Sequence, residues 1–173
     1  EKYISETVES VCQQTEIINK NCELEYIIID GNSTDKTNII IKDLKKKYPF
    51  LTHIIEEDNG LYDGLSKGFK LVSGDVMGYL NAGDFLNKTA FSVLRKVFDE
   101  KKINWATGLK IIYNEYSEIT KIQIPYNYRS NLIRCGAYGK YLPFIQQEST
   151  FWRPALIKNL DMEFFRKLKK SGD

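Results

Sequence analysis

The stretch Asp75-Val76-Met77-Gly78-Tyr79-Leu80-Asn81-Ala82-Gly83-Asp84 decides the fold class. Its apolar run, residues 76–80, is typical of a strand that is buried on both faces, as in a parallel sheet. The run ends in Asn, Gly and Asp, which places the carboxylate of Asp84 at the carboxyl end of the predicted strand. Because open α/β sheets bind their ligands at that edge, Asp84 is the first candidate for a functional residue.

Helical and strand-like segments alternate around this predicted strand. Apolar spacing predicts helices over residues 3–14, 36–47, 61–72 and 87–101, and apolar runs predict strands over 24–30, 52–55 and 76–80. This alternation is the signature of a doubly wound sheet, so we predict an α/β fold with a mostly parallel sheet flanked by helices. A length of 173 residues fits a single domain.

The pattern changes after residue 105. Two extended runs within 106–124, separated by a polar turn at 114–117, predict a hairpin. Residues 125–143 are rich in Tyr, Asn and Gly and show little periodicity, so we predict a long functional loop. Order is expected to return at 146–153, followed by a helical region over 154–168 that is broken near Asn159.

Composition excludes several classes of function. The net charge of +2 is too small to indicate a nucleic-acid partner. The basic clusters at 42–47 and 166–170 are interpreted as solvated helix faces, with a peripheral contact to anionic lipid left open. Three cysteines without CxxC spacing argue against a disulfide framework or a zinc site and favour a reducing, cytoplasmic compartment. No segment approaches bilayer-spanning length, and no signal peptide is seen.

Three acids, Asp30, Asp58 and Asp84, stand at or just after the ends of predicted strands. In a parallel sheet they would point to one edge, where convergent carboxylates suit Mn²⁺ or Mg²⁺. Strand-terminal Asp residues also cap helices, and for Asp30 both readings stay open. For Asp84 we favour the metal, because Ala82-Gly83 allows a ligand to approach closely. Neither a Rossmann fingerprint nor a Walker loop occurs, so a metal would have to neutralise any bound phosphates.

Four stretches together resemble the family 2 glycosyltransferases with the GT-A fold. Residues 27–37 (IIIDGNSTDKT) look like the early strand and turn of that family, and residues 58–68 (DNGLYDGLSKG) resemble the D-x-G-I-Y-D-A-M-N-K-G segment of a bacterial branch. Residues 74–84 (GDVMGYLNAGD) resemble its strand and metal motif, and residues 147–153 (QESTFWR) resemble its acceptor-side stretch. The match covers most of the chain in the right order.

The resemblance implies inverting transfer of a sugar from a nucleotide diphosphate sugar, usually UDP-linked, to an acceptor hydroxyl in bacterial surface-polysaccharide assembly. Residues 1–104 would form the nucleotide-sugar half, and 105–173 an incomplete acceptor half that takes a saccharide or lipid-linked saccharide. Asp84 would bind Mn²⁺ or Mg²⁺ at the diphosphate, and Asp30 and Asp58 would line the nucleotide pocket. The remaining donor-side candidates are Asn81, Gly83 and Lys67; for Lys67 a solvated position on its helix is the alternative.

Two departures from the family pattern affect the donor site. Gly83 stands where the family often has a second Asp, so one carboxylate is missing beside Asp84. Gly31 replaces another second Asp after the early strand, which leaves a uridine or a guanosine donor open. The family's opening strand has no counterpart before Glu1, and the family continues beyond Asp173, so we expect a fragment of a longer protein. A nucleotide-binding module without catalytic activity is therefore the alternative function.

The catalytic base is the least constrained assignment. In a direct displacement, a carboxylate deprotonates the acceptor hydroxyl while the metal takes up charge on the departing diphosphate. Asp173 is the first choice, because Gly172-Asp173 matches the pair that carries the family base, and Glu148 is the second. A structural role for Glu148 has equal weight. Six aromatic residues are candidates either for stacking on base or sugar faces or for packing: Tyr62, Trp152, Tyr126, Tyr128, Tyr138 and Tyr141.

Overall fold

The computed structural model describes residues 1–169 of the chain. The helices are α1 (Ile4–Cys12), α2 (Thr15–Ile18), α3 (Thr37–Lys47), α4 (Leu61–Phe69), α5 (Ala90–Lys101), α6 (Ser130–Arg134) and α7 (Met162–Phe165), with 3₁₀ turns at Gln147–Ser149 and Pro154–Leu156. The strands are β1 (Tyr26–Asp30), β2 (Leu51–Ile55), β3 (Trp105–Thr107), β4 (Lys110–Tyr113), β5 (Ile119–Gln123) and β6 (Thr150–Trp152).

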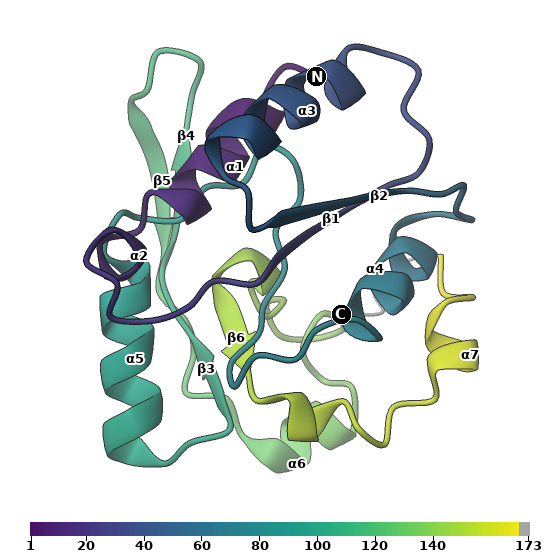
Figure 1. Cartoon of the computed structure of the whole chain (residues 1–173). Coiled ribbons are helices and arrows are strands. Elements are labelled where there is room, and N and C mark those ends of the chain that lie inside the picture. The colour runs from purple at the N-terminus through teal and green to yellow at the C-terminus, as the bar shows by residue number, and fades with distance from the viewer. Residues whose placement is uncertain (170–173) are drawn as a thin grey trace.

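The parallel pair β1–β2 and the two helices over it form the main core. The pair aligns Tyr26 with Leu51 at one end and Asp30 with Ile55 at the other. Helices α1 and α3 pack against each other, as Figure 1 shows, and α4 packs against β1. The buried cluster consists of Ile4, Val8, Cys12, Ile41, Leu44 and Leu51. Its members recur three, four or eight residues apart within each helix, so the predicted amphipathic periodicity selected the buried faces.

The prediction of a strand buried on both faces at residues 76–80 is wrong. Only Met77 of this run is buried, and it makes a single antiparallel bridge with Trp152 of β6. The Met77 amide donates to the Trp152 carbonyl at 2.8 Å, and the Trp152 amide donates back at 2.9 Å. Next to this bridge the backbone of Gly78 lies so close to the Phe151 ring that a Cβ would come within 2.7 Å of it. The residues of this run are therefore apolar because the segment packs beside β6, and the segment is not a strand of a β-ladder.

The rest of the sheet structure is antiparallel. β3 pairs with β6, and β4 pairs with β5 in the predicted hairpin, which extends away from the helices at one side of the molecule (Figure 1). The predicted long loop over 125–143 contains one short helix, α6, and the predicted helical region over 154–168 is broken before α7 as expected. The α/β class is thus confirmed, with parallel pairing between β1 and β2.

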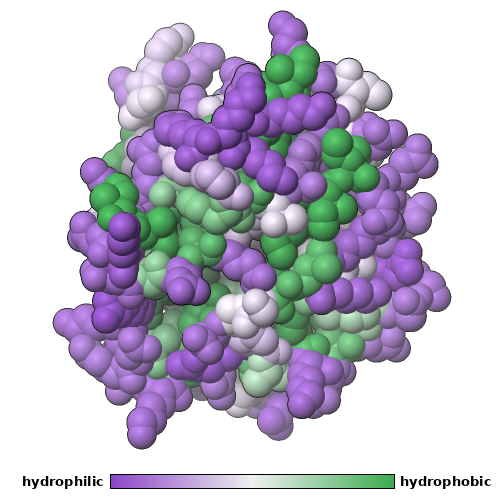
Figure 2. Space-filling model, in the orientation of Figure 1, coloured by the Kyte–Doolittle hydropathy of each residue, from purple (hydrophilic) through white to green (hydrophobic). Residues whose placement is uncertain are grey.

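The surface mixes charged and apolar side chains. Figure 2 shows hydrophobic areas between hydrophilic residues on one face of the molecule. Apolar side chains of the β4–β5 hairpin are exposed, among them Ile111, Tyr113, Ile119 and Ile122. Within residues 1–169, no helix has the length and apolar character needed to cross a bilayer.

Candidate functional site

Asp30 and Asp58 lie together where β1 ends. Asp30 is 5% exposed, and its Oδ1 accepts a hydrogen bond from the Ser33 amide at 2.7 Å. Asp58 follows β2, and its Oδ1 accepts from the Gly60 amide at 2.9 Å. A Cβ at Gly31 would lie 2.6 Å from Asp58 Oδ2, so the Asp58 carboxylate rests directly against the residue that follows Asp30. The structure therefore brings two of the three predicted strand-end acids into one site.

His53, the single histidine of the chain, lies beside Asp30. Its Nε2 is 3.6 Å from Asp30 Oδ2, and both side chains are at least nine-tenths buried. Within the described part of the chain, neither of these two atoms has a hydrogen-bond partner. His53 is aligned with Ile28, so the diagonal neighbour on the same face of the pair is Asp30. Only the register of the two strands reveals this contact.

Asp84 lies in a tight turn after residues 76–80. Its amide donates to the Asn81 carbonyl at 3.0 Å, and Gly83 has a φ of +116°, a conformation that favours glycine. Burial, followed by the negative charge of Glu148, raises the pKa of Asp84 above its usual range, against the opposing effects of Lys110 and of hydrogen bonds from Asn81. Asp84 and Glu148 thus form a pair of carboxylates close enough to act on one another.

Lys110 of β4 completes this arrangement and was missed by the sequence reasoning. It forms an ion pair with Glu148, whose side chain is only 14% exposed. Glu148 stands in the 3₁₀ turn just before β6, so residues from two distant segments meet beside Asp84. Because Lys110 belongs to a predicted hairpin with no motif of its own, no signal in the sequence pointed to it.

The three strand-end acids, Asp30, Asp58 and Asp84, do not form a single cluster of metal ligands in the described part of the chain. No group of three or more His, Cys, Asp or Glu side chains that could hold a metal ion occurs within residues 1–169. Asp30 and Asp58 form one site, while the acidic neighbour of Asp84 is Glu148. Residue 77 pairs with β6, and the segment 76–80 is not a ladder strand next to β1.

Lys67 is held by the acidic turn that precedes α4. Its Nζ donates to the Glu57 carbonyl at 2.6 Å and lies 2.9 Å from Glu56 Oε1, and its side chain is 16% exposed. The alternative of a fully solvated lysine is thereby excluded. A contact between Lys67 and a phosphate stays a prediction.

Asp63 is a buried acid that organises the Asp58 turn. Its Oδ2 accepts hydrogen bonds from the backbone amide of Asn59 at 3.0 Å and from the Asn59 side chain at 3.3 Å. Its Oδ1 accepts from Arg166 Nε at 3.0 Å, which links α4 to the segment after α7. The Asn59 amide, and then the Arg166 charge, hold the pKa of Asp63 below its usual range.

We expect Asp63→Asn to reduce the acid sensitivity of the fold. Because the folded-state pKa of Asp63 is lowered, its ionised form stabilises the fold above the unfolded-state pKa of about 3.9, and this contribution is lost as the pH falls through the folded-state value. Denaturant unfolding of both proteins between pH 7 and pH 3 measures the effect. The variant should be less stable at pH 7, and the difference should narrow toward pH 3. A pH-independent difference would contradict the role of the ionised carboxylate.

Most of the candidate aromatic residues pack rather than line an open site. Tyr62 is 5% exposed and meets the Phe165 ring edge-on at 5.4 Å. Trp152 contacts Phe69 and Tyr79. Tyr128 contacts Trp105, and its other ring neighbours are Tyr126 and Tyr138. Tyr126 and Tyr141 are the two of the six that stay largely exposed, at 55% and 76%, so stacking on a ligand remains a prediction for these two.

Arg153, the last residue of the QESTFWR stretch, has a structural role. Its guanidinium donates to the carbonyls of Ile103 at 3.2 Å and Phe98 at 3.1 Å and stacks over the Phe98 ring. These bonds tie the end of β6 to α5 and to the approach to β3. The stretch therefore combines a structural arginine with the functional candidate Glu148.

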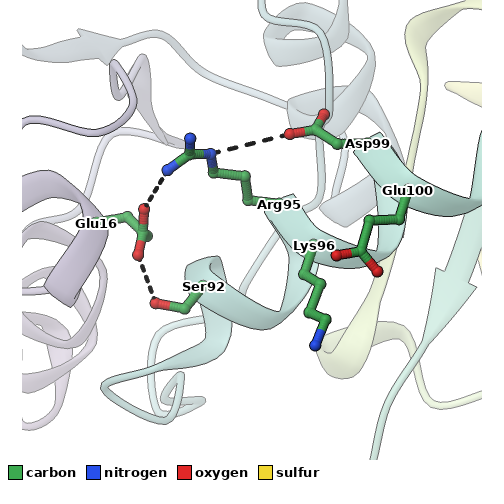
Figure 3. A pocket seen from close by; sticks show the side chains of 6 residues that line it. All are labelled: Glu16, Ser92, Arg95, Lys96, Asp99 and Glu100. Atoms are coloured by element: carbon green, nitrogen blue, oxygen red, sulfur yellow. Dashed lines mark hydrogen bonds and ion pairs between the residues drawn. The ribbon is translucent and has the colours of Figure 1, made fainter.

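A polar pocket of about 280 Å³ lies away from these residues, between α2 and α5 (Figure 3). Glu16 accepts a hydrogen bond from Ser92 at 2.7 Å and pairs with Arg95 at 3.0 Å, as the dashed lines in Figure 3 mark. The hydrogen bond from Ser92, and then that from Arg95, lower the pKa of Glu16. None of the predicted site residues lines this pocket, and the ion pair between Glu16 and Arg95 joins α2 to α5. Asp173, the first choice of base, lies outside the described residues.

Comparison with curated proteins finds partial relatives among polysaccharide-forming enzymes. The minor teichoic acid biosynthesis protein GgaB of Bacillus subtilis is 30% identical over 103 residues, which cover 59% of this chain and 11% of GgaB. The poly-β-1,6-N-acetyl-D-glucosamine synthase of Staphylococcus epidermidis is 32% identical over 102 residues, 58% of this chain and 25% of the synthase. The chain thus spans a quarter or less of the length of these two relatives.

Solved structures share the fold at low sequence identity. S. aureus TarS in complex with UDP superposes with a TM-score of 0.70 at 19% identity, over 99% of this chain and 48% of TarS. The mannosyltransferase PcManGT of Pyrobaculum calidifontis, in complex with GDP-Man and Mn²⁺, gives a TM-score of 0.64 at 16% identity, over 92% of this chain and 43% of PcManGT. The family model "Glycosyl transferase family 2" matches residues 1–158, so the chain belongs to glycosyl transferase family 2.

Proposed function

We propose that this chain carries the donor-binding part of an inverting, metal-dependent glycosyltransferase that takes its sugar from a UDP-linked donor in bacterial polysaccharide assembly. The observation that carries the proposal is the carboxylate pair of Asp84 and Glu148 with Lys110 beside it. Its acceptor is a saccharide or lipid-linked saccharide hydroxyl. The relatives support this direction, because GgaB and the N-acetylglucosamine polymer synthase are named for bacterial polymers and TarS binds UDP and UDP-GlcNAc.

The carboxylate pair fits a divalent cation. Burial, and then the charge of Glu148, raise the pKa of Asp84. The carboxylates of Asp84 and Glu148 have the single positive charge of Lys110 beside them. Mn²⁺ and Mg²⁺ prefer such hard oxygen ligands and are commonly held by one or two carboxylates together with substrate phosphates. Asp84 would hold the ion, with Glu148 close by and Asn81 and Gly83 shaping the turn. When bound, the ion supplies charge neutralisation for the departing diphosphate. A complex of PcManGT contains Mn²⁺ with GDP-Man.

The protein's own residues would divide the remaining work. Asp30 and Asp58 accept hydrogen bonds from the nucleoside, with His53 behind Asp30 and Asp63 fixing the turn that carries Asp58. Lys110, now paired with Glu148, would also face a diphosphate bound at Asp84, where a cation is favourable. A carboxylate takes the proton of the acceptor hydroxyl as it attacks the anomeric carbon from the side opposite the diphosphate, which inverts the configuration.

The proposal is tested with the full-length protein and a panel of UDP- and GDP-linked sugars, with Mn²⁺ present or removed by a chelator. We expect release of UDP from a UDP-linked sugar that depends on Mn²⁺, and product with inverted anomeric configuration by NMR. Absence of both turnover and nucleotide binding across the panel would reject the proposal. UDP binding without turnover would favour the alternative, a nucleotide-binding module. The cytoplasmic location inferred from the cysteines stays a prediction.

Gly31→Ala is expected to weaken UDP binding about tenfold, which corresponds to roughly 1.4 kcal/mol. An added Cβ would lie 2.6 Å from Asp58 Oδ2, and because the clashing atom ends a side chain, Asp58 would turn away while the backbone stays in place. Gly74→Ala is the matched control, since the nearest atom to its added Cβ is 3.8 Å away. Calorimetry with UDP and thermal unfolding measure the two effects. Equal UDP affinity in both variants would remove Asp58 from the nucleotide pocket.

A further inference from the structure

One face of α1 and the residue two positions beyond it carry a row of polar side chains. Thr7, Ser10 and Gln14 are spaced by three and four residues, which places them on the same side of the helix. Thr7 is 2% exposed and Gln14 is fully buried. The apolar residues of α1 on its other side, Ile4, Val8 and Cys12, belong to the main core. Because buried polar side chains cost free energy unless they are hydrogen-bonded, these three side chains require hydrogen-bond partners.

The partners are backbone groups of the segment that carries Asp84. The Gly83 amide donates to Thr7 Oγ1 at 2.9 Å, and the Leu86 amide donates to Ser10 Oγ at 3.2 Å. Gln14 uses both ends of its side chain: Nε2 donates to the Asn87 carbonyl at 2.8 Å, and Oε1 accepts from the Phe91 amide at 3.0 Å. Four backbone groups between residues 83 and 91 are thus held by three side chains from more than 70 residues earlier.

The row is itself held together. Ser10 Oγ donates to the Thr7 carbonyl at 2.8 Å, and Gln14 Nε2 also donates to the Ser10 carbonyl at 2.8 Å. The backbone continues the contact, since the Thr15 amide donates to the Lys88 carbonyl at 3.1 Å. The three side chains therefore present a fixed set of donors and acceptors rather than independent contacts.

The segment 83–91 has little regular structure of its own before α5 begins at Ala90. Gly83 takes a φ of +116°, and its amide is the group bound by Thr7. The Gly83 amide belongs to the peptide that precedes Gly83, so the bond to Thr7 restrains the turn from which the Asp84 side chain leaves the backbone. A ligand-binding carboxylate gains affinity when its position is set before binding.

We propose that Thr7, Ser10 and Gln14 are positioning residues for Asp84: they act as a template that holds the backbone of residues 83–91 and thereby sets the affinity of the metal and diphosphate site. The affinity part of this inference rests on the proposed function, while the ordering of the segment does not. The effect on metal and diphosphate affinity and the ordering of residues 83–91 can therefore be tested separately.

The test uses Thr7→Val, which keeps the shape of the side chain and removes the acceptor for the Gly83 amide. We expect the Kd for UDP in the presence of Mn²⁺ to rise about tenfold, and amide hydrogen exchange of residues 81–91 to accelerate relative to α3. Thr7→Ser keeps the hydroxyl and should restore both values to within about twofold of the wild type. Gln14→Leu removes three hydrogen bonds, two of them to the segment 83–91, and should have a larger effect on both readouts.

Val8→Ala is the matched control, because Val8 is fully buried on the same helix but belongs to the core cluster. It should lower the melting temperature at least as much as Thr7→Val, with UDP affinity kept and the relative exchange of 81–91 unchanged. Wild-type exchange in this segment for Thr7→Val would overturn the template. If the wild-type protein binds no UDP, the proposed function is rejected. The hydrogen-exchange measurement still shows whether Thr7, Ser10 and Gln14 order residues 83–91. If Gln14→Leu does not fold, the comparison of Thr7→Val with Thr7→Ser remains decisive.

Discussion

Asp84→Asn is expected to abolish Mn²⁺-dependent UDP binding while leaving the fold nearly intact. The substitution keeps the size of the side chain and its contact with Asn81, and it removes the negative charge. The affinity of a carboxylate for a dication depends mainly on that charge, and one or two carboxylates are all that such a site commonly offers. Burial, and then the charge of Glu148, raise the pKa of Asp84, so ionised Asp84 destabilises the folded protein without the cation. Its loss therefore costs binding rather than stability.

Calorimetry with UDP at saturating Mn²⁺, together with thermal unfolding, separates the two effects. We expect no measurable Mn²⁺-dependent heat for Asp84→Asn and a melting temperature within a few degrees of the wild type. Asp43→Asn is the control, because Asp43 is an exposed acid whose ion pair with Lys46 lies on α3. Wild-type affinity for UDP in Asp84→Asn at the same Mn²⁺ concentration would remove Asp84 from the metal role.

Local patterns in the sequence predicted most elements of the fold. Four predicted helices correspond to α1, α3, α4 and α5 of the structure. They could be predicted because their apolar residues repeat with the helical period, and these apolar faces are the ones that pack against the rest of the fold. The strands that became β1 and β2, and the β4–β5 hairpin, were found because short apolar runs end in turn residues. In each case the information lies within a dozen consecutive residues.

Residues 76–80 show the limit of predicting structure from local sequence patterns. An apolar run of five residues reports burial, but the pairing partner of Met77 is Trp152, 75 residues later, and no local pattern encodes that choice. The same limit applies to the site. Asp30 and Asp58 were found because each follows a strand, whereas His53, Lys110 and Thr7 act through partners in other segments, and none of them stands in a motif.

The assignment of the catalytic base rests on Asp173 and Glu148, and the surroundings of Glu148 bear on it. The Glu148 carboxylate is mostly buried, is paired with Lys110, and acts on Asp84. A carboxylate that is held by a lysine and lies at the proposed diphosphate site is better suited to binding and orientation than to taking a proton from the acceptor. Asp173 follows Gly172 at the position that matches the family base, so we keep it as the proposed base.

In the full-length protein, Asp173→Asn is expected to lower kcat by about 10²-fold or more with the affinity for UDP unchanged, because a base acts only in the transition state. Glu148→Gln removes the charge that Lys110 balances at the proposed diphosphate site and should mainly raise KM for the donor, with a change in kcat of less than about tenfold. Glu163→Gln, at an acid of α7 with a largely exposed side chain, controls for the loss of a carboxylate charge. Steady-state kinetics with the donor and acceptor varied in turn separate these outcomes. Loss of turnover in Glu148→Gln combined with near wild-type turnover in Asp173→Asn would reverse the assignment, with Glu148 as the base and Lys110 as the residue that holds it.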